Sequence, residues 1–230
     1  MNTRHVPTTG AARARRPRPW LLAAALSLAL PAPALADAVT DWNTLAGTLS
    51  APGNAPPQQF RILAMTHVAI HDALNAIDPR YRTYAPSAGA SATASPDAAV
   101  ARAAADVLRA AVPANQANIT TAYDTYIAAL PACPAAAPTC IADGEAAGAA
   151  AAAAIVAMRT LDGSETPHLP YTLAADLGVY QTTPGVAFAQ FGNWGNLTPF
   201  AIGNAAQFRS GRTDFFHING RTYTDDYNEV

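Results

Sequence analysis

Lysine is absent from all 230 residues of the chain, and glutamate occurs only three times, at Glu145, Glu165 and Glu229. So few glutamates leave no obvious pair of carboxylates for general acid–base catalysis. The sequence also lacks the glycine-rich motifs of dinucleotide and nucleotide-phosphate sites and the G-x-S-x-G motif of serine hydrolases. These absences exclude several of the commonest enzyme classes.

Residues 1–36 have the pattern of a secretory signal peptide. Five arginines form the basic region: Arg4, Arg13, Arg15, Arg16 and Arg18. The apolar run that follows, Trp20–Leu30, has 11 residues, whereas a membrane span needs roughly 20. Proline at 31 and 33 breaks the helix before the small-x-small site Ala34-Leu35-Ala36. We expect cleavage after Ala36 and a periplasmic or secreted protein; a retained anchor and the twin-arginine route are the alternatives.

Residues 37–230 are acidic. They contain nine arginines against sixteen aspartates and glutamates, which gives a formal charge of −7. A negative chain without a basic cluster does not favour nucleic acid or an anionic membrane surface as a partner. We therefore predict no nucleic-acid partner, and no membrane contact after cleavage of the signal.

The two cysteines, Cys133 and Cys140, are separated by the six residues Pro-Ala-Ala-Ala-Pro-Thr. In an oxidising compartment, an even number of cysteines at short spacing usually forms disulfides. We predict a structural bridge that closes a proline-rich loop between two helices, with two free thiols as the alternative.

Alanine accounts for 57 residues, and this composition favours helix. Four helices are predicted, over residues 58–77, 95–112, 113–130 and 141–161. The first has apolar residues at spacings of three and four, including Phe60, and its other side is also apolar, which is typical of a buried helix. In the last, Gly144, Gly148 and Ala152 recur every four residues and indicate close approach to another helix backbone.

Residues 163–220 contain many Pro, Gly, Asn and Thr residues without a sustained period, which predicts a long irregular segment. Its aromatic residues are expected to attach it to the core rather than to bind a ligand: Trp194, Phe200, Phe208, Phe215 and Phe216. Residues 223–230 (YTDDYNEV) resemble the first turns of another helix. The expected fold class is all-α, an incomplete helical bundle with a long irregular segment near its C-terminal end.

His67 and His71 lie at positions i and i+4 of the first helix and share one face about 6 Å apart. They could bind zinc or copper, support a neighbouring active site, or take hydrogen bonds as buried side chains in a polar seam. Asp72 points roughly 100° away and is expected to orient a histidine or to bond a neighbouring helix. The buried structural role is the preferred interpretation, and no metal is predicted.

Six stretches occur in the order and spacing of one family. They are DWN at Asp41, RILAMTHVAIHDALNAIDPRY at 61–81, SPDAAVARAAADVL at 95–108, MRTLDG at 158–163, LTPFAIGNAAQFR at 197–209, and YTDDYNEV at the end. Together they resemble the N-terminal region of bacterial vanadium-dependent haloperoxidase-like proteins, which belong with the type-2 phosphatidic acid phosphatases. The stretch 61–81 is the most specific. The resemblance implies a helical bundle.

The resemblance also implies an oxyanion pocket that holds vanadate, or the phosphate of a substrate, among cationic and hydrogen-bonding groups. The family's motifs for this pocket are a Lys followed seven residues later by Arg-Pro, a Ser-Gly-His and an Arg-x-x-x-Gly-x-His. None of them occurs in this sequence, and in the family they follow the equivalent of residues 223–230. We therefore carry over no catalytic residue and expect residues 37–230 to be the N-terminal helical part of the domain, truncated before these motifs.

The sequence thus predicts an N-terminal fragment, inactive alone, of an exported haloperoxidase-like protein. The full-length family oxidises halide with peroxide, so vanadate is expected for the whole protein and no cofactor for this chain alone. The missing C-terminal half of its own domain is the expected partner, and a homo-oligomer is considered for the full-length form. A phosphoester hydrolase of the same superfamily and a non-catalytic periplasmic helical module are the alternatives.

Overall fold

The structure is a computed structural model that describes residues 37–86, 88–167, 174, 180–185 and 191–208. The chain divides into two units, Met1–Asp37 and Ala38–Val230. The predicted signal peptide and the helix predicted over 223–230 lie outside the described residues. The described part contains five α-helices, two 3₁₀ helices and no strand, which confirms the all-α fold class.

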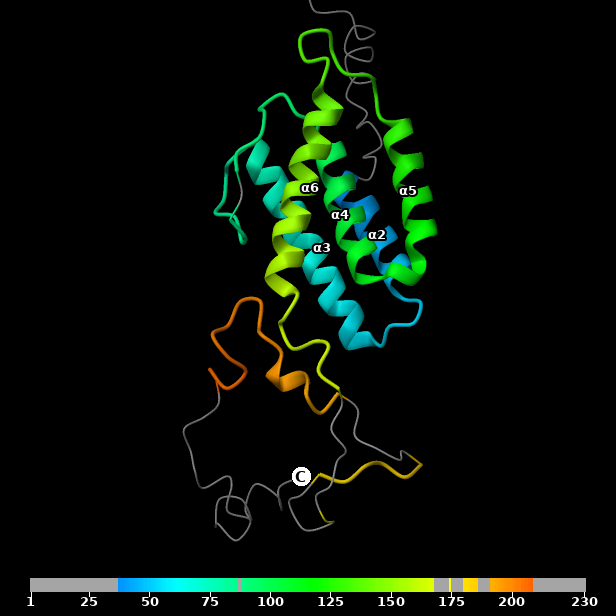
Figure 1. The fold of residues 1–230 in the computed structure, drawn as a ribbon, viewed down its shortest axis with the longest axis vertical. Helices are drawn as coiled ribbons and strands as arrows, with labels where there is room; N and C mark the ends of the chain where they lie inside the picture. The colour runs from blue at the N-terminus through cyan, green and yellow to red at the C-terminus, as the bar shows by residue number, and fades with distance from the viewer. Residues whose placement is uncertain (1–36, 87, 168–173, 175–179, 186–190, 209–230) are drawn as a thin grey trace, which may run out of the picture. The chain divides into compact units, whose positions relative to one another are not determined.

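The central helix of this bundle is α4. The α-helices are α2 (Ala38–Ser50), α3 (Pro56–Ile77), α4 (Pro96–Ala111), α5 (Gln116–Ala129) and α6 (Cys140–Arg159), and the 3₁₀ helices are η1 (Pro113–Asn115) and η2 (Trp194–Asn196). α4 packs against all four other α-helices, and α3 also packs against α2 and α6 (Figure 1). Nine of the sixteen residues of α4 are buried, and six of these are alanine. Such small side chains allow neighbouring helices to pack closely around it.

Two glycines of α6 bring it against the backbone of α4. A Cβ atom at Gly144 would lie 2.3 Å from the carbonyl oxygen of Ser95, and one at Gly148 would lie 2.4 Å from that of Ala99. The close approach predicted from this small-residue stripe is therefore present. By length and composition α6 could also cross a membrane, but helices of the core of other proteins pass the same test, and α6 packs against α3 and α4.

The start of α4 follows the sequence signal at residues 95–97. The Ser95 hydroxyl accepts a hydrogen bond from the Ala98 N–H at 3.2 Å, Pro96 is the first helical residue, and Asp97 lies in the first turn. The side chain thus satisfies an N–H group that the helix leaves without a partner, and the acid lies at the positive end of the helix dipole.

The sequence interpretation missed α2. This helix contains Thr, Asn and Gly, which are weak helix formers, and tertiary contacts offset this weakness. Trp42 and Ala46 are fully buried, and the Trp42 ring meets the Tyr126 ring of α5 edge-on at 5.8 Å between centroids.

The burial expected for α3 on all sides is wrong at one side of the helix. Phe60 is 69% exposed, while Ile62, Met65 and Ala69 on the other side are buried. Both sides of the helix are apolar, so spacing alone did not distinguish the side that faces the core from the side that faces the loop after the helix.

The described residues after α6 have no regular structure apart from η2, as the irregular composition predicted. Arg159, at the end of α6, attaches them to the bundle. Its guanidinium donates to the carbonyl oxygens of Thr198 at 2.6 Å and Pro199 at 3.2 Å, and lies 3.6 Å from the centroid of the Phe200 ring. Phe200 therefore helps to attach the segment, whereas Phe208 is 78% exposed and does not. Residues 215 and 216 lie outside the described residues.

Cys133 and Cys140 form a disulfide, with 5.7 Å between their Cα atoms. The bridge closes the proline-rich connection between α5 and α6, and Cys140 is the first residue of α6. No cysteine is left free.

Candidate functional site

Asp72 is the most enclosed of the three side chains of α3 that the sequence singled out. Its side chain is 1% exposed. Oδ1 accepts hydrogen bonds from His71 Nδ1 at 2.9 Å and from the Tyr84 N–H at 2.8 Å, and Oδ2 accepts from the Ala85 N–H at 2.7 Å. The carboxylate therefore orients His71, as the sequence suggested, and bonds a loop rather than a neighbouring helix.

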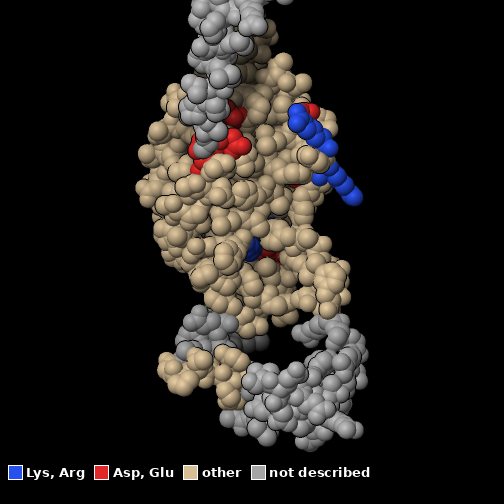
Figure 2. Space-filling model, turned by 180° about the vertical axis from the view of Figure 1, so that it is seen from behind, with Lys and Arg blue, Asp and Glu red and all other residues tan. Residues whose placement is uncertain are grey.

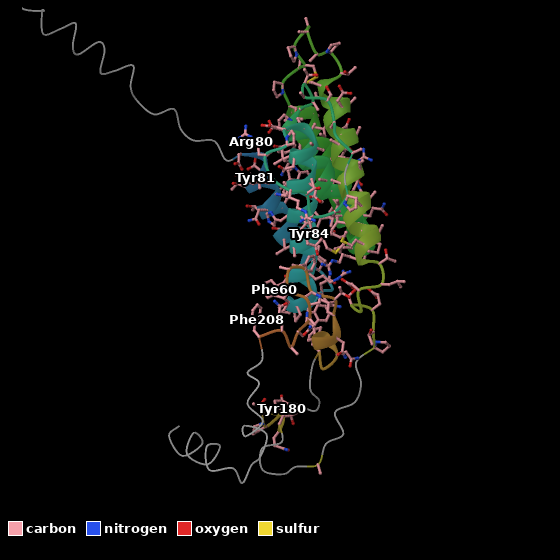
Figure 3. All side chains as sticks on the ribbon, turned by 90° about the vertical axis from the view of Figure 1, so that its left-hand side faces the viewer. Phe60, Arg80, Tyr81, Tyr84, Tyr180 and Phe208 are labelled. Carbon is pink, nitrogen blue, oxygen red and sulfur yellow. A yellow bond between two sulfur atoms is a disulfide. The ribbon has the colours of Figure 1, made fainter. Side chains whose placement is uncertain are left out.

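Asn75 performs a similar task one turn further along α3. Its side-chain oxygen accepts from the N–H groups of Tyr81 at 2.7 Å and Arg80 at 3.2 Å, and its amide donates to the His71 carbonyl oxygen at 2.8 Å. Two buried polar side chains thus hold the loop of residues 78–86 as it returns along α3. Figure 3 shows Arg80, Tyr81 and Tyr84 following one another down the side of this helix toward Phe60. The sequence interpretation missed the role of Asn75, which only the returning loop defines.

His67 and His71 differ in their surroundings although they are one turn apart. His67 Nε2 lies 2.9 Å from the Asn43 side-chain oxygen and so links α3 to α2. The His71 side chain is 40% exposed, and its ring centroid lies 6.3 Å from that of Tyr81. Neither histidine is buried, so the predicted buried seam is wrong. The described part of the chain has no group of three or more His, Cys, Asp or Glu arranged for a metal ion.

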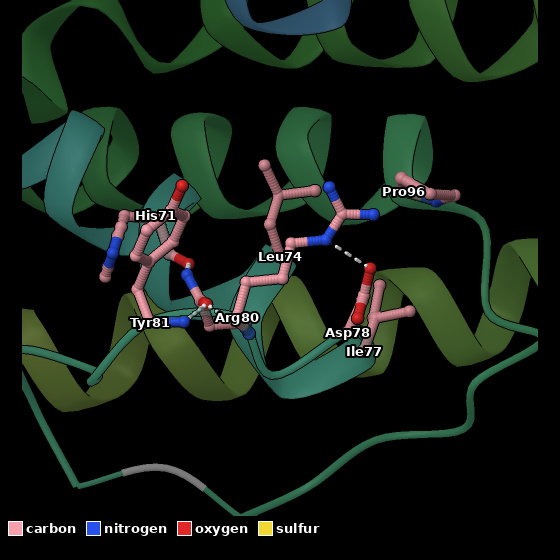
Figure 4. A pocket seen from close by; sticks show the side chains of 8 residues that line it. His71, Leu74, Ile77, Asp78, Arg80, Tyr81 and Pro96 are labelled. Carbon is pink, nitrogen blue, oxygen red and sulfur yellow. Dashed lines mark hydrogen bonds and ion pairs between the residues drawn. The ribbon is translucent and has the colours of Figure 1, made fainter.

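Two hollows flank His71, which lines both of them. The first has a volume of about 380 Å³ and is lined by His71, Leu74, Asn75, Ile77, Asp78, Arg80, Tyr81 and Pro96. In Figure 4, Leu74 occupies its centre, the Tyr81 ring lies beside His71 at one end, and Pro96 lies at the other. The second is lined by His67, Val68, His71, Arg82, Thr83 and Tyr84.

Most arginines of the described part are engaged with carboxylates. The pairs are Arg61–Asp162, Arg80–Asp78, Arg102–Asp106 and Arg109–Asp106. Burial alone would raise the pKa of Asp162, but hydrogen bonds from Arg61 and Ser164 outweigh burial and lower it. On the face shown in Figure 2 the charged groups are few and separated rather than gathered into one patch.

This donor set does not fit vanadate. A trigonal-bipyramidal oxyanion needs several cationic and hydrogen-bonding groups directed at the same point. The two most buried arginines, Arg61 and Arg159, face Asp162 at 2.8 and 3.9 Å, so a carboxylate already occupies the position between them. The chain also has no lysine. We therefore derive no step through vanadate on the described residues.

A second polar cluster joins α4, α5 and α6 and was missed at the sequence level. The Tyr123 hydroxyl donates a hydrogen bond to Glu145, and the Arg109 guanidinium lies 4.8 Å from the Tyr123 ring centroid. Burial, with the Glu145 hydrogen bond, raises the pKa of Tyr123 to about 12. A phenol of this kind stays protonated near neutral pH and acts as a structural donor rather than a base. The helical spacings of Arg102, Asp106 and Arg109 were the available signal.

Residues 36–121 match the family model described as the vanadium chloroperoxidase N-terminal domain. The match covers α2, α3, α4 and η1 and ends within α5. It supports the resemblance of this stretch to the N-terminal part of haloperoxidase-like proteins. No curated protein and no solved structure gives a significant match to the chain.

Proposed function

We propose, from the haloperoxidase-family relation of residues 36–121, that this chain supplies the N-terminal helical part of a vanadium-dependent haloperoxidase-like protein. Peroxide-dependent halide oxidation belongs to the whole protein, and the described residues act as its scaffold. The observation that carries the proposal is the donor set: most arginines of the described part are already paired with carboxylates, and the sequence has no lysine. The C-terminal half of the family's domain is the proposed partner, and it would bring the groups that hold vanadate.

The packing of the described helices supports a scaffold. The matched stretch contains the central helix α4, and α5 and α6 complete the packing around it. A continuous core runs through all five α-helices, from Trp42 in α2 to Ile155 in α6, both fully buried. A bundle packed in this way presents a rigid surface to a partner domain.

Export is part of the same proposal. The signal-like pattern of residues 1–36 and the Cys133–Cys140 disulfide support a periplasmic or secreted protein, because disulfides persist in oxidising compartments.

Turnover assays test the scaffold role directly. The purified chain is incubated with vanadate, bromide, peroxide and a dye that brominates, and separately with p-nitrophenyl phosphate. We expect neither reaction to exceed the rate with free vanadate or buffer alone, and the ⁵¹V resonance of vanadate to keep its width when the protein is added. Bromination above background would overturn the scaffold role, and phosphate release would favour the phosphoester hydrolase.

The DNA downstream of codon 230 tests the family assignment of the whole protein. We expect it to encode, in or near frame, the Lys with Arg-Pro seven residues later and the two histidine motifs. A sequence without these motifs would contradict the proposal and favour a non-catalytic helical module.

A further inference from the structure

The connection between α5 and α6 is closed by the Cys133–Cys140 disulfide and has few other ties. Residues 130–139 are all exposed or half-buried, and they lie at the end of the bundle where α6 begins (Figure 1). Within the described part of the chain, their hydrogen bonds run to one another and to the adjoining turns of α5 and α6. The bridge is therefore the main constraint on this connection.

The bridge joins α6 at the point where this helix contacts the start of α4. The Cys140 carbonyl oxygen accepts a hydrogen bond from the Ser95 N–H at 2.7 Å, and Cys133 Sγ accepts one from the Ile141 N–H at 3.1 Å. Ser95 is the residue that caps α4. One turn further along α6, Gly144 lies directly against the Ser95 carbonyl oxygen. The disulfide and the first residues of both helices thus form one continuous contact.

The two halves of α6 are attached to the bundle in different ways. The buried residues of the first half are all small: Cys140, Gly144, Ala147 and Gly148. Small side chains bury little apolar surface, so they hold a helix weakly. The link of this half to α5 is the hydrogen bond from Tyr123 to Glu145.

The second half of α6 has stronger attachments of its own. Ile155 is fully buried, and the Arg159 guanidinium bonds the Thr198 and Pro199 carbonyl oxygens and the Tyr84 hydroxyl. None of these contacts involves the connection of residues 130–139. The first half of α6 therefore depends on the disulfide far more than the second half does.

We propose that the Cys133–Cys140 disulfide is a redox latch: its reduction releases the first half of α6 from the start of α4, while the rest of the bundle stays folded. The reductant is a dithiol of the thiol–disulfide oxidoreductase class. One of its thiolates attacks a sulfur of the bridge, and its second thiol then closes its own disulfide. Two electrons and two protons thereby pass to Cys133 and Cys140, which become thiols. The latch opens in a reducing compartment and closes in an oxidising one. This inference goes beyond the scaffold role and does not depend on it.

Hydrogen exchange of the backbone amides tests the latch on the intact chain, before and after reduction with dithiothreitol. We expect the amides of residues 144–151 to exchange about tenfold faster or more in the reduced chain, because local opening of this half is no longer limited by the bridge. The amides of residues 66–77 in α3 and 155–159 in α6 should change by less than about twofold. Reoxidation with oxidised glutathione should restore the slow exchange.

Matched variants separate the bridge from other effects of the reductant. The double variant C133S/C140S should show the fast exchange of residues 144–151 with and without dithiothreitol. The control T139A removes the hydrogen bond from Thr139 to Asp143 but keeps the bridge, so its exchange should stay slow until dithiothreitol is added. Unchanged exchange of residues 144–151 on reduction, equal acceleration in all helices, loss of the cooperative fold, or fast exchange in oxidised T139A would overturn the proposal.

Discussion

At the interface of α4 and α6 the two backbones meet with almost no side chain between them, whereas along α3 two buried polar side chains bind the backbone of the loop that follows the helix. In the first region, a Cβ on Gly148 would lie 2.4 Å from the Ala99 carbonyl oxygen. In the second, Asp72 and Asn75 reach out to the backbone N–H groups of residues 80, 81, 84 and 85.

The difference follows from what each region must satisfy. Helix backbones bond within themselves, so α4 and α6 can touch wherever the side chains are small enough. A loop has N–H groups that need partners once they are buried, so it is positioned by acceptors with a fixed reach. The first arrangement excludes empty space, and the hollow beside His71 lies along the second.

The largest effect is expected for G148A, at the interface of α4 and α6. The new methyl group would meet backbone atoms that cannot move aside, so α6 must separate from α4. We expect a loss of about 3 kcal/mol or more in the free energy of unfolding measured in urea. The matched control is G47A in α2, where a Cβ would have nothing within 4 Å. That change should raise stability by about 0.5–1 kcal/mol, since alanine is the better helix former.

If G148A and G47A changed stability equally, the interface of α4 and α6 would not depend on close contact between the two backbones. It would then not differ in this respect from the region where the loop lies along α3.

The next largest effect is expected for D72A, where α3 binds the loop of residues 78–86. Removal of the carboxylate leaves the N–H groups of Tyr84 and Ala85 without their acceptor, which should cost about 2–3 kcal/mol in urea unfolding. It should also remove the hydrogen bond at His71 Nδ1, visible as a change in the imidazole ¹⁵N shifts. The matched control is D78A: this carboxylate is 59% exposed, and loss of its surface pair with Arg80 should change stability by less than about 1 kcal/mol. Equal losses in the two variants would show that burial of Asp72 has no special role.

The interface of α4 and α6 was the easier of the two regions to predict from the sequence. Gly144 and Gly148 at a spacing of four define a contact surface regardless of which helix lies opposite, and Ser95-Pro96-Asp97 defines a helix start by local chemistry alone. The sequence located the other helices within one to three residues at most ends, because their composition and boundaries are local signals.

The contacts between α3 and the loop of residues 78–86 could not be predicted in this way. The partners of Asp72 are backbone groups 12 and 13 residues away, and no side-chain pattern marks them. The same reason explains the errors at Phe60 and α2. Whether an apolar face is covered depends on which distant segment lies against it, and Trp42 is buried where α2 packs against α3, α4 and α5, with the Tyr126 ring edge-on to it.

The smallest effect is expected at the polar cluster that joins α4, α5 and α6, where Y123F removes the hydrogen bond to Glu145. We expect a loss of about 1 kcal/mol below pH 10. Because the pKa of Tyr123 is raised from 10 to about 12, its contribution is complete below pH 10 and is lost as the pH rises toward 12, where a phenolate would face the Glu145 carboxylate. The stability difference between wild type and Y123F should therefore shrink over that interval. Y81F, at a 73% exposed tyrosine, corrects for the general effect of alkali. A difference that stayed constant from pH 9 to 12 would mean that burial and the Glu145 hydrogen bond do not raise the pKa of Tyr123.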